Sequence, residues 1–329
     1  MRAFRHADVV RQRSLRLLPI AVTLVLVGAI GCGGGEEDGV GGPQDSKRAV
    51  ATTGMVADMV ARIGGAETQV NGLMGPGVDP HLYKASAGDV RTLAGADIIF
   101  YNGLHLEAAM GEVLERMTGR TVTVPVAEGI PEDRRLTSEY FTGSWDPHVW
   151  FDVELWAETT RRVEEGLISL DPDGEAGYRA RAEVFRDTLA ALDTWVRERV
   201  SELTGERRIL VTAHDAFGYF GRAYGFEVVG LQGISTVSEA GTSDVQRIAD
   251  LVVERRVPAI FLETSVAQRT IEAVQAAVRN RGYEVRIGGA LFSDAMGSAG
   301  TPEGSYPGMV RHNVNTIVEA LLVEPEEAR

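Results

Sequence analysis

Cysteine is almost absent from this chain, which has one, Cys32, among its 329 residues. A single thiol cannot form a disulfide within the chain and cannot build a site from several thiolates. A Walker loop is also missing, because the glycines Gly72, Gly75 and Gly77 are followed by no lysine and open no helix. Any metal site must therefore use imidazoles and carboxylates, and any ATP-driven step must come from partner proteins.

Basic clusters are lacking outside the N-terminus. The formal net charge is −14, and binding to phosphate backbones needs clustered Lys and Arg. Nucleic acid is therefore not an expected partner. With 24% charged and 44% hydrophobic residues, the composition is ordinary for a globular protein, and the length predicts about two domains.

A long apolar run is missing as well. The run from Leu17 to Ile30 has about 14 residues, which is short for a membrane-spanning helix. Arginines precede it, and it ends in Ala29-Ile30-Gly31-Cys32, which resembles a lipobox. We expect residues 1–31 to be a lipoprotein signal peptide, with Cys32 lipidated. The alternatives are an uncleaved membrane anchor, or a plain signal peptide followed by an incidental cysteine.

The rest of the chain divides into four predicted segments. Residues 32–47 are rich in glycine and predict a flexible tether. Residues 48–172 and 205–329 each alternate short apolar runs with amphipathic stretches, which predicts two α/β lobes with small parallel sheets. Between them, residues 173–204 carry one apolar stripe from Glu175 to Leu203, which predicts a single long, stiff linking helix.

Two Asp-Pro-His tripeptides, Asp79-Pro80-His81 and Asp146-Pro147-His148, each precede an apolar or aromatic segment. Proline fixes φ and biases the residue before it toward extended backbone, so each imidazole is held on a stiff turn. Such a turn suits a metal ligand. The plainer alternative is a turn with histidine as polar filler.

Four polar side chains stand at expected strand ends in four different βα units: His81, His148, His214 and Asp294. Ligands of parallel sheets lie beyond the carboxyl ends of the strands. Three imidazoles and one carboxylate form a set suited to Zn²⁺, with Mn²⁺ and Fe²⁺ as alternatives. Glu263, also at a strand end, is expected to partner an imidazole N–H.

Other histidines and aspartates are expected to have structural roles. His105 begins an expected helix over 105–117, which favours a capping role over ligation. His312 is expected to face solvent or pack on the last helix. Asp79, Asp146 and Asp215 are expected turn or cap residues.

The sequence resembles the TroA-type metal-binding lipoproteins that serve zinc and manganese ABC importers, a group that includes adhesin lipoproteins. The resemblance runs from about Val50 to the C-terminal helix and is carried by GLMGPGVDPHLY, YNGLHLE, DPHVWFD, LVTAHDAFGYFGRAYGFEV and GGALFSDAMG. It implies two lobes joined by one long helix. It also implies metal ligation by the residues matching His81, His148, His214 and Asp294.

The resemblance leaves the metal open between Zn²⁺ and Mn²⁺. Zinc-specific members often carry a histidine-rich loop before the second Asp-Pro-His, whereas residues 128–145 contain no histidine. Manganese-specific members often have Glu where His214 stands.

The expected function is capture of the ion in the cleft between the lobes by a lipid-anchored monomer outside the cytoplasm. Delivery would go to a membrane permease driven by its ATPase. The chain is not expected to be an enzyme. The alternatives are an extracytoplasmic metallohydrolase, with Glu263 as base, and an adhesin with a structural metal.

Overall fold

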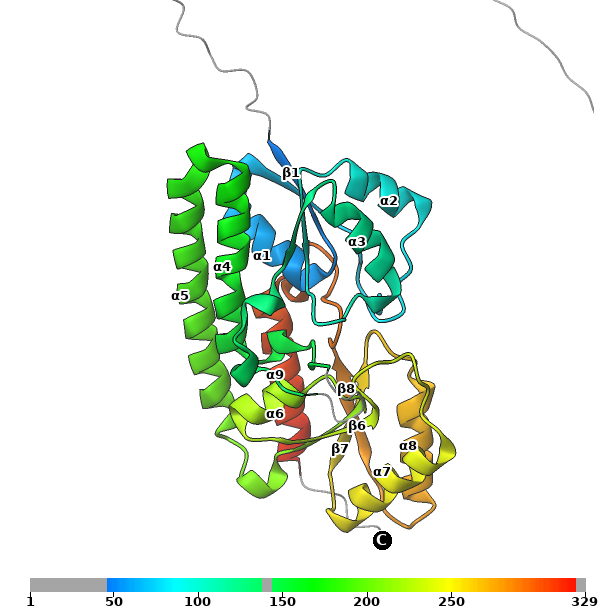
Figure 1. Cartoon of the computed structure of the whole chain (residues 1–329). Coiled ribbons are helices and arrows are strands. Elements are labelled where there is room, and N and C mark those ends of the chain that lie inside the picture. The colour runs from blue at the N-terminus through cyan, green and yellow to red at the C-terminus, as the bar shows by residue number, and fades with distance from the viewer. Residues whose placement is uncertain (1–45, 138–143, 324–329) are drawn as a thin grey trace, which may run out of the picture. The chain divides into compact units, whose positions relative to one another are not determined.

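The computed structural model describes residues 46–137 and 144–323 (Figure 1). The expected signal peptide over 1–31, the lipidation site Cys32 and nearly all of the tether over 32–47 lie outside these residues. Among the described helices, none combines the length and the apolar character needed to cross a membrane.

A four-stranded parallel sheet forms the first half of the chain, with the order β2-β1-β3-β4. Its strands are β1 (Lys47–Ala51), β2 (Thr68–Gly72), β3 (Ile98–Tyr101) and β4 (Val122–Pro125). Ala49 of β1 lies in register with Val70 on one side and Ile98 on the other. Because all four strands are parallel, their carboxyl ends meet at one edge of the sheet.

Helices cover both faces of this sheet. Ala49 and Ala51 pack into a core shared with α1, whereas Val50 and Ile99 face a second core beneath α2 and α3. This alternation is the period-two pattern of a strand buried on both faces. The helices are α1 (Gly54–Gly64), α2 (Ala87–Ala94) and α3 (Gly111–Thr118).

Two parallel strand pairs form the sheets of the second half, β5 with β6 and β7 with β8. The strands are β5 (Ile209–His214), β6 (Glu227–Gln232), β7 (Ala259–Glu263) and β8 (Arg286–Leu291). Val211 of β5 faces a core under α7 and α8, while Leu210 faces the larger core that includes α9. The helices are α6 (Gly218–Tyr224), α7 (Thr242–Glu254), α8 (Arg269–Arg279) and α9 (Tyr306–Leu322).

The long helix predicted between the halves is α5 (Glu175–Val200), which packs alongside α4 (Val153–Leu170) (Figure 1). Its 26 residues correspond to roughly 40 Å. Near its start, Arg181 donates to the carbonyl of Ile63 in α1, and near its end Arg199 donates to Asn315 in α9. The structure thus confirms an α/β chain with small parallel sheets covered by helices and one long helix.

The two halves also share one hydrophobic core. It includes α1 and α4 from the first half, α6 and α9 from the second, and seven buried side chains of α5: Tyr178, Ala182, Phe185, Leu189, Leu192, Val196 and Val200. Tyr306, at the start of α9, donates from its hydroxyl to the carbonyl of Trp150. The halves are therefore held together by extensive packing and not by a single connection.

The helix expected over 105–117 begins later than predicted. Helix α3 starts at Gly111, after a 3-10 turn over Ala108–Met110. Gly103, Leu104 and His105 have φ values of 85°, 54° and 66°, which are incompatible with a right-handed helix. His105 is exposed and does not cap a helix.

Candidate metal centre

Each of the four predicted ligands comes from a different connection in the fold. His81 lies in the loop between β2 and α2, and His148 directly precedes a short 3-10 helix that leads into α4. His214 is the last residue of β5, and Asp294 follows β8. All four are at most 4% exposed.

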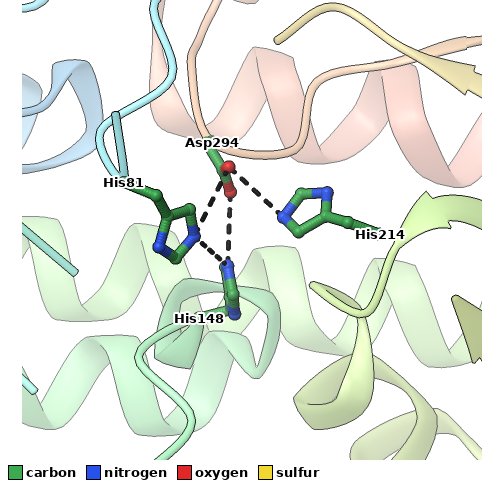
Figure 2. A group of neighbouring side chains, drawn as sticks. All are labelled: His81, His148, His214 and Asp294. Carbon is green, nitrogen blue, oxygen red and sulfur yellow. Dashed lines mark hydrogen bonds and ion pairs between the residues drawn. The ribbon is translucent and has the colours of Figure 1, made fainter. Parts of the chain in front are cut away.

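The four side chains converge on one point (Figure 2). The Nε2 atoms of His81 and His148 are 3.3 Å apart. Nε2 of His214 lies 3.3 Å from Oδ2 of Asp294, and Nε2 of His148 lies 3.4 Å from Oδ1. One donor atom from each residue falls within 4.8 Å of all the others. The chain thus brings together two pairs of residues from its two halves.

These separations fit a small divalent ion. Ligand atoms about 2.0–2.1 Å from a tetrahedral ion lie about 3.3 Å from one another. Both carboxylate oxygens of Asp294 and Nε2 of His214 are buried without a hydrogen-bond partner. Buried polar atoms without partners are costly, and a cation bound between them would satisfy all three.

Carboxylates orient two of the imidazoles. Nδ1 of His148 lies 2.7 Å from Oδ1 of Asp146, and Nδ1 of His214 lies 2.5 Å from Oε2 of Glu263. Each contact places a proton on Nδ1 and leaves Nε2 facing the cluster. The sequence suggested Glu263 for such a role, whereas Asp146 was interpreted as a turn residue. Asp146 stands two residues before His148, and this spacing is the sequence signal that could have identified it as the partner of that imidazole.

The loop that carries Asp294 is fixed by neighbouring polar groups. Asn313 of α9 accepts from the N–H of Phe292 at 2.9 Å and donates to its carbonyl at 2.7 Å. The indole of Trp150 donates to the carbonyl of Ser293 at 3.0 Å. Asp294 is therefore positioned from both sides, by the last helix and by the segment after His148.

A hydrogen bond between loops lies beside His81. Asp79 accepts from the backbone N–H of His81 at 2.8 Å and from the hydroxyl of Thr236 at 2.5 Å. Thr236 belongs to the connection between β6 and α7. This contact joins the loop that carries His81 to the second half of the chain.

The cluster is electrostatically polarised. Burial lowers the pKa of His81 to about 3, against a weaker attraction to Asp294. Burial also opposes the charge on His148, but Asp146 and Asp294 outweigh it and raise the pKa to about 9. For His214, Glu263 and Asp294 likewise overcome burial and raise its pKa. Burial disfavours the charged form of Asp294, yet His214 and His148 hold its pKa well below the usual range.

Without an ion, these pKa shifts favour protonated imidazoles at His148 and His214, whose positive charges lie beside the ionised carboxylate of Asp294. They favour a neutral imidazole at His81. A cation bound at the Nε2 atoms must displace those protons, because a protonated nitrogen has no lone pair to donate.

The remaining histidines of the described chain lie outside the cluster. Nε2 of His312 lies 3.1 Å from the carbonyl of Ala290, and its ring packs edge-on against Phe292. His105 lines a cavity beside the cluster together with His81. Neither residue is among the four converging donors.

Comparison with known proteins agrees with this architecture. The zinc-binding protein TroA of Treponema pallidum is 53% identical over 278 residues, covering 84% of this chain and 90% of that protein. The manganese-binding lipoprotein MntA of Bacillus subtilis is 44% identical over 305 residues, which cover 92% of this chain and 98% of that protein. The solved periplasmic zinc-binding protein TroA of Treponema pallidum superposes with a TM-score of 0.82 at 52% identity, covering 84% of this chain and 99% of that one.

The family profile described as "ZnuA: Zinc-uptake complex component A periplasmic" matches residues 49–320. That range contains strands β2 to β8, the long helix and all four converging side chains. The chain therefore belongs to the ZnuA family of zinc-uptake complex components.

Proposed function

We propose that this protein is the substrate-binding component of an ABC importer for a divalent transition metal, Zn²⁺ or Mn²⁺. The ion is held by His81, His148, His214 and Asp294. The observation that carries the proposal is the convergence of three Nε2 atoms and one carboxylate within 4.8 Å in a buried site. Imidazole and carboxylate are donors that both ions accept in proteins.

The proposed organisation follows the predicted segments. Residues 1–31 direct export and are removed, Cys32 carries the lipid, and the tether over 32–47 holds the body near the membrane. Residues 48–172 and 205–329 act as two lobes joined by residues 173–204. The protein is a monomer that docks on a membrane permease, and a cytoplasmic ATPase supplies the energy. Relatives named manganese-binding lipoproteins support this anchoring.

Release of the ion is proposed to involve small shifts and not a wide opening. The core shared by both halves and the packing of α5 along them oppose a large hinge rotation. The loop that carries His81 is joined to the second half of the chain by the hydrogen bond between Asp79 and Thr236, whereas the loop that carries Asp294 is held from both sides. Local movement of the loop that carries His81 would separate the donors without breaking the core.

Catalysis is not part of the proposed function. Four protein ligands complete a tetrahedral set, whereas catalytic zinc usually keeps a position for water. The carboxylates nearest to the imidazoles, Asp146 and Glu263, already accept from His148 and His214. Both therefore orient ligands, and neither is placed as a free general base.

The test is metal analysis of protein purified without added metal, followed by competition between Zn²⁺ and Mn²⁺ against a chromogenic chelator. We expect one ion per chain, and a loss of at least about a hundredfold in affinity for His148→Ala. His312→Ala is the matched control and should bind normally. Equal affinity of the His148→Ala variant, or no bound ion in the wild type, would refute the proposal. Uptake of the ion by cells that depend on this gene, rescued by the wild type alone, would separate transport from a structural metal.

A further inference from the structure

His105 lines a cavity of about 200 Å³ whose wall also includes His81, one of the four converging side chains. Of the four converging side chains, His81 is the one that lines this cavity, and it is 4% exposed while His148 and His214 are fully buried. His105 itself is exposed. An ion that enters this cavity from solvent can therefore meet two imidazoles, the exposed one of His105 and the more buried one of His81.

The backbone at His105 has an unfavourable conformation. Leu104 and His105 are consecutive residues with positive φ, after Gly103, which also has positive φ. Side chains other than glycine rarely adopt this region, and such residues persist only where the surroundings impose them. Strain of this kind is concentrated at functional sites, which makes the residue it presents a candidate for a role.

A buried network imposes this conformation. One oxygen of Glu107 accepts from the N–H of Asn102 and from the hydroxyl of Thr52, each at 2.7 Å, and the other accepts from the N–H of Gly103 at 3.1 Å. The amide of Asn102 donates to the carbonyl of Pro147 at 3.0 Å. The loop is thus attached to the end of β1 and to the turn that carries His148, so His105 has a defined place relative to the cluster.

The wall of the cavity explains why an imidazole is useful there. Most of it is apolar, including Leu104, Trp145, Ile234 and Val237. A hydrated dication that enters such a space loses water ligands and gains none from these side chains. Beside the hydroxyls of Ser144 and Ser235, the polar side chains of the wall are the imidazoles of His81 and His105, and imidazole is a common ligand for Zn²⁺ and Mn²⁺.

We propose that His105 is a transfer ligand, whose imidazole binds the divalent ion in this cavity and passes it to or from His81. The inference rests on the proposed metal-binding function. It adds a binding position that the ion occupies only in transit, alongside the four residues that hold it at rest. A position on the path lowers the barrier in both directions, so it speeds binding and release by the same factor and leaves the equilibrium affinity unchanged.

The test compares His105→Asn with His105→Asp in the full chain. Both side chains have the same shape and both tolerate positive φ, so the backbone is preserved, but only Asp restores a good metal ligand. Stopped-flow mixing with Zn²⁺ gives the binding rate, and transfer to excess chelator gives the release rate. We expect His105→Asn to slow both rates about three- to tenfold with an unchanged Kd, and His105→Asp to recover most of the loss.

Glu115→Gln is the control for charge, because exposed Glu115 lines an adjoining groove together with His105 but supplies no imidazole. The rates of Zn²⁺ binding and release measured for Glu115→Gln should stay within about twofold of those of the wild type. Unchanged rates in His105→Asn would overturn the transfer role while leaving the proposed function intact. A weaker Kd with an unchanged binding rate would also overturn it, since His105 would then be a resident ligand. Failure of the wild type to bind Zn²⁺ or Mn²⁺ would overturn the proposed function itself.

Discussion

At the scale of single residues, the site depends on how two carboxylates direct two imidazoles. Asp146 and Glu263 each accept from Nδ1 of a histidine, so the Nε2 atoms of His148 and His214 face Asp294. The same carboxylates favour protonated imidazoles when no ion is bound. Binding of an ion at the proposed site should therefore be coupled to proton release.

The first prediction concerns pH. The pKa of His148 in the metal-free protein is raised to about 9, so its imidazole is protonated at pH 7 and becomes neutral as the pH rises through 9. The ion competes with that proton, so apparent affinity should rise from pH 6 to pH 9, with about one or more protons released per ion at pH 7. Calorimetry in buffers of different ionisation enthalpy measures the release. Affinity that is flat over this range would contradict the assignment of these protons.

The second prediction concerns Glu263. Glu263→Gln keeps the shape of the side chain but weakens the acceptor for Nδ1 of His214, which lies 2.5 Å away. Loss of such a partner typically reduces metal affinity about 10- to 100-fold. Chelator competition measures the change, and Glu303→Gln, which lies beside His312 and is not one of the four donors, is the matched control. An affinity equal to that of the control would show that Glu263 does not support the ligand.

At the scale of elements, strand ends place two of the polar side chains of the proposed site. His214 ends β5 and Glu263 ends β7, so the two side chains meet because these strands are neighbours. The sequence predicted each of these strands and the helix over 175–203, because apolar periodicity and turn residues are local signals. It did not predict the left-handed residues 103–105, because the buried carboxylate that imposes them is satisfied only in the folded chain.

The third prediction tests the packing of α5. Leu189 is 1% exposed in the core shared by both halves, and Val184 on the same helix is 65% exposed. Leu189→Ala should lower the free energy of unfolding by about 2–5 kcal/mol, because it removes buried methyl groups and leaves a cavity. Val184→Ala should change it by less than about 0.5 kcal/mol. Urea unfolding with a metal chelator present gives both values, and equal values would argue against a core beneath this helix.

At the scale of the whole molecule, the proposed ion site is built by residues from both halves, so binding should stabilise the fold as a unit. At a hundredfold excess over Kd, a ligand that binds only the folded state adds about 2.7 kcal/mol. The fourth prediction is a rise in Tm of about 5 °C with Zn²⁺ over chelator-treated protein. In the His148→Ala variant, Zn²⁺ should raise Tm little over the chelator-treated variant. A full rise in Tm in that variant would place the ion elsewhere.

The fifth prediction concerns attachment to the membrane. Cys32 is the only thiol in the chain and follows the small residues of a lipobox-like segment. Cys32→Ala should release the protein into the soluble extracytoplasmic fraction, because one lipid-modified residue provides the anchor. Fractionation followed by immunoblotting measures the shift. Membrane attachment that persists in the variant would indicate an uncleaved anchor instead.

The sequence by itself determined which residues could bind a metal and the order of strands and helices around them. Asp-Pro-His turns, strand-end polar residues and helical periodicity are properties of short segments, so they can be read without knowing what lies nearby. Only the tertiary structure decided that His81, His148, His214 and Asp294 meet, that Asp146 holds an imidazole, and that His105 and His81 line one cavity. Those facts depend on distances between residues far apart in the chain, and packing of the common core sets those distances.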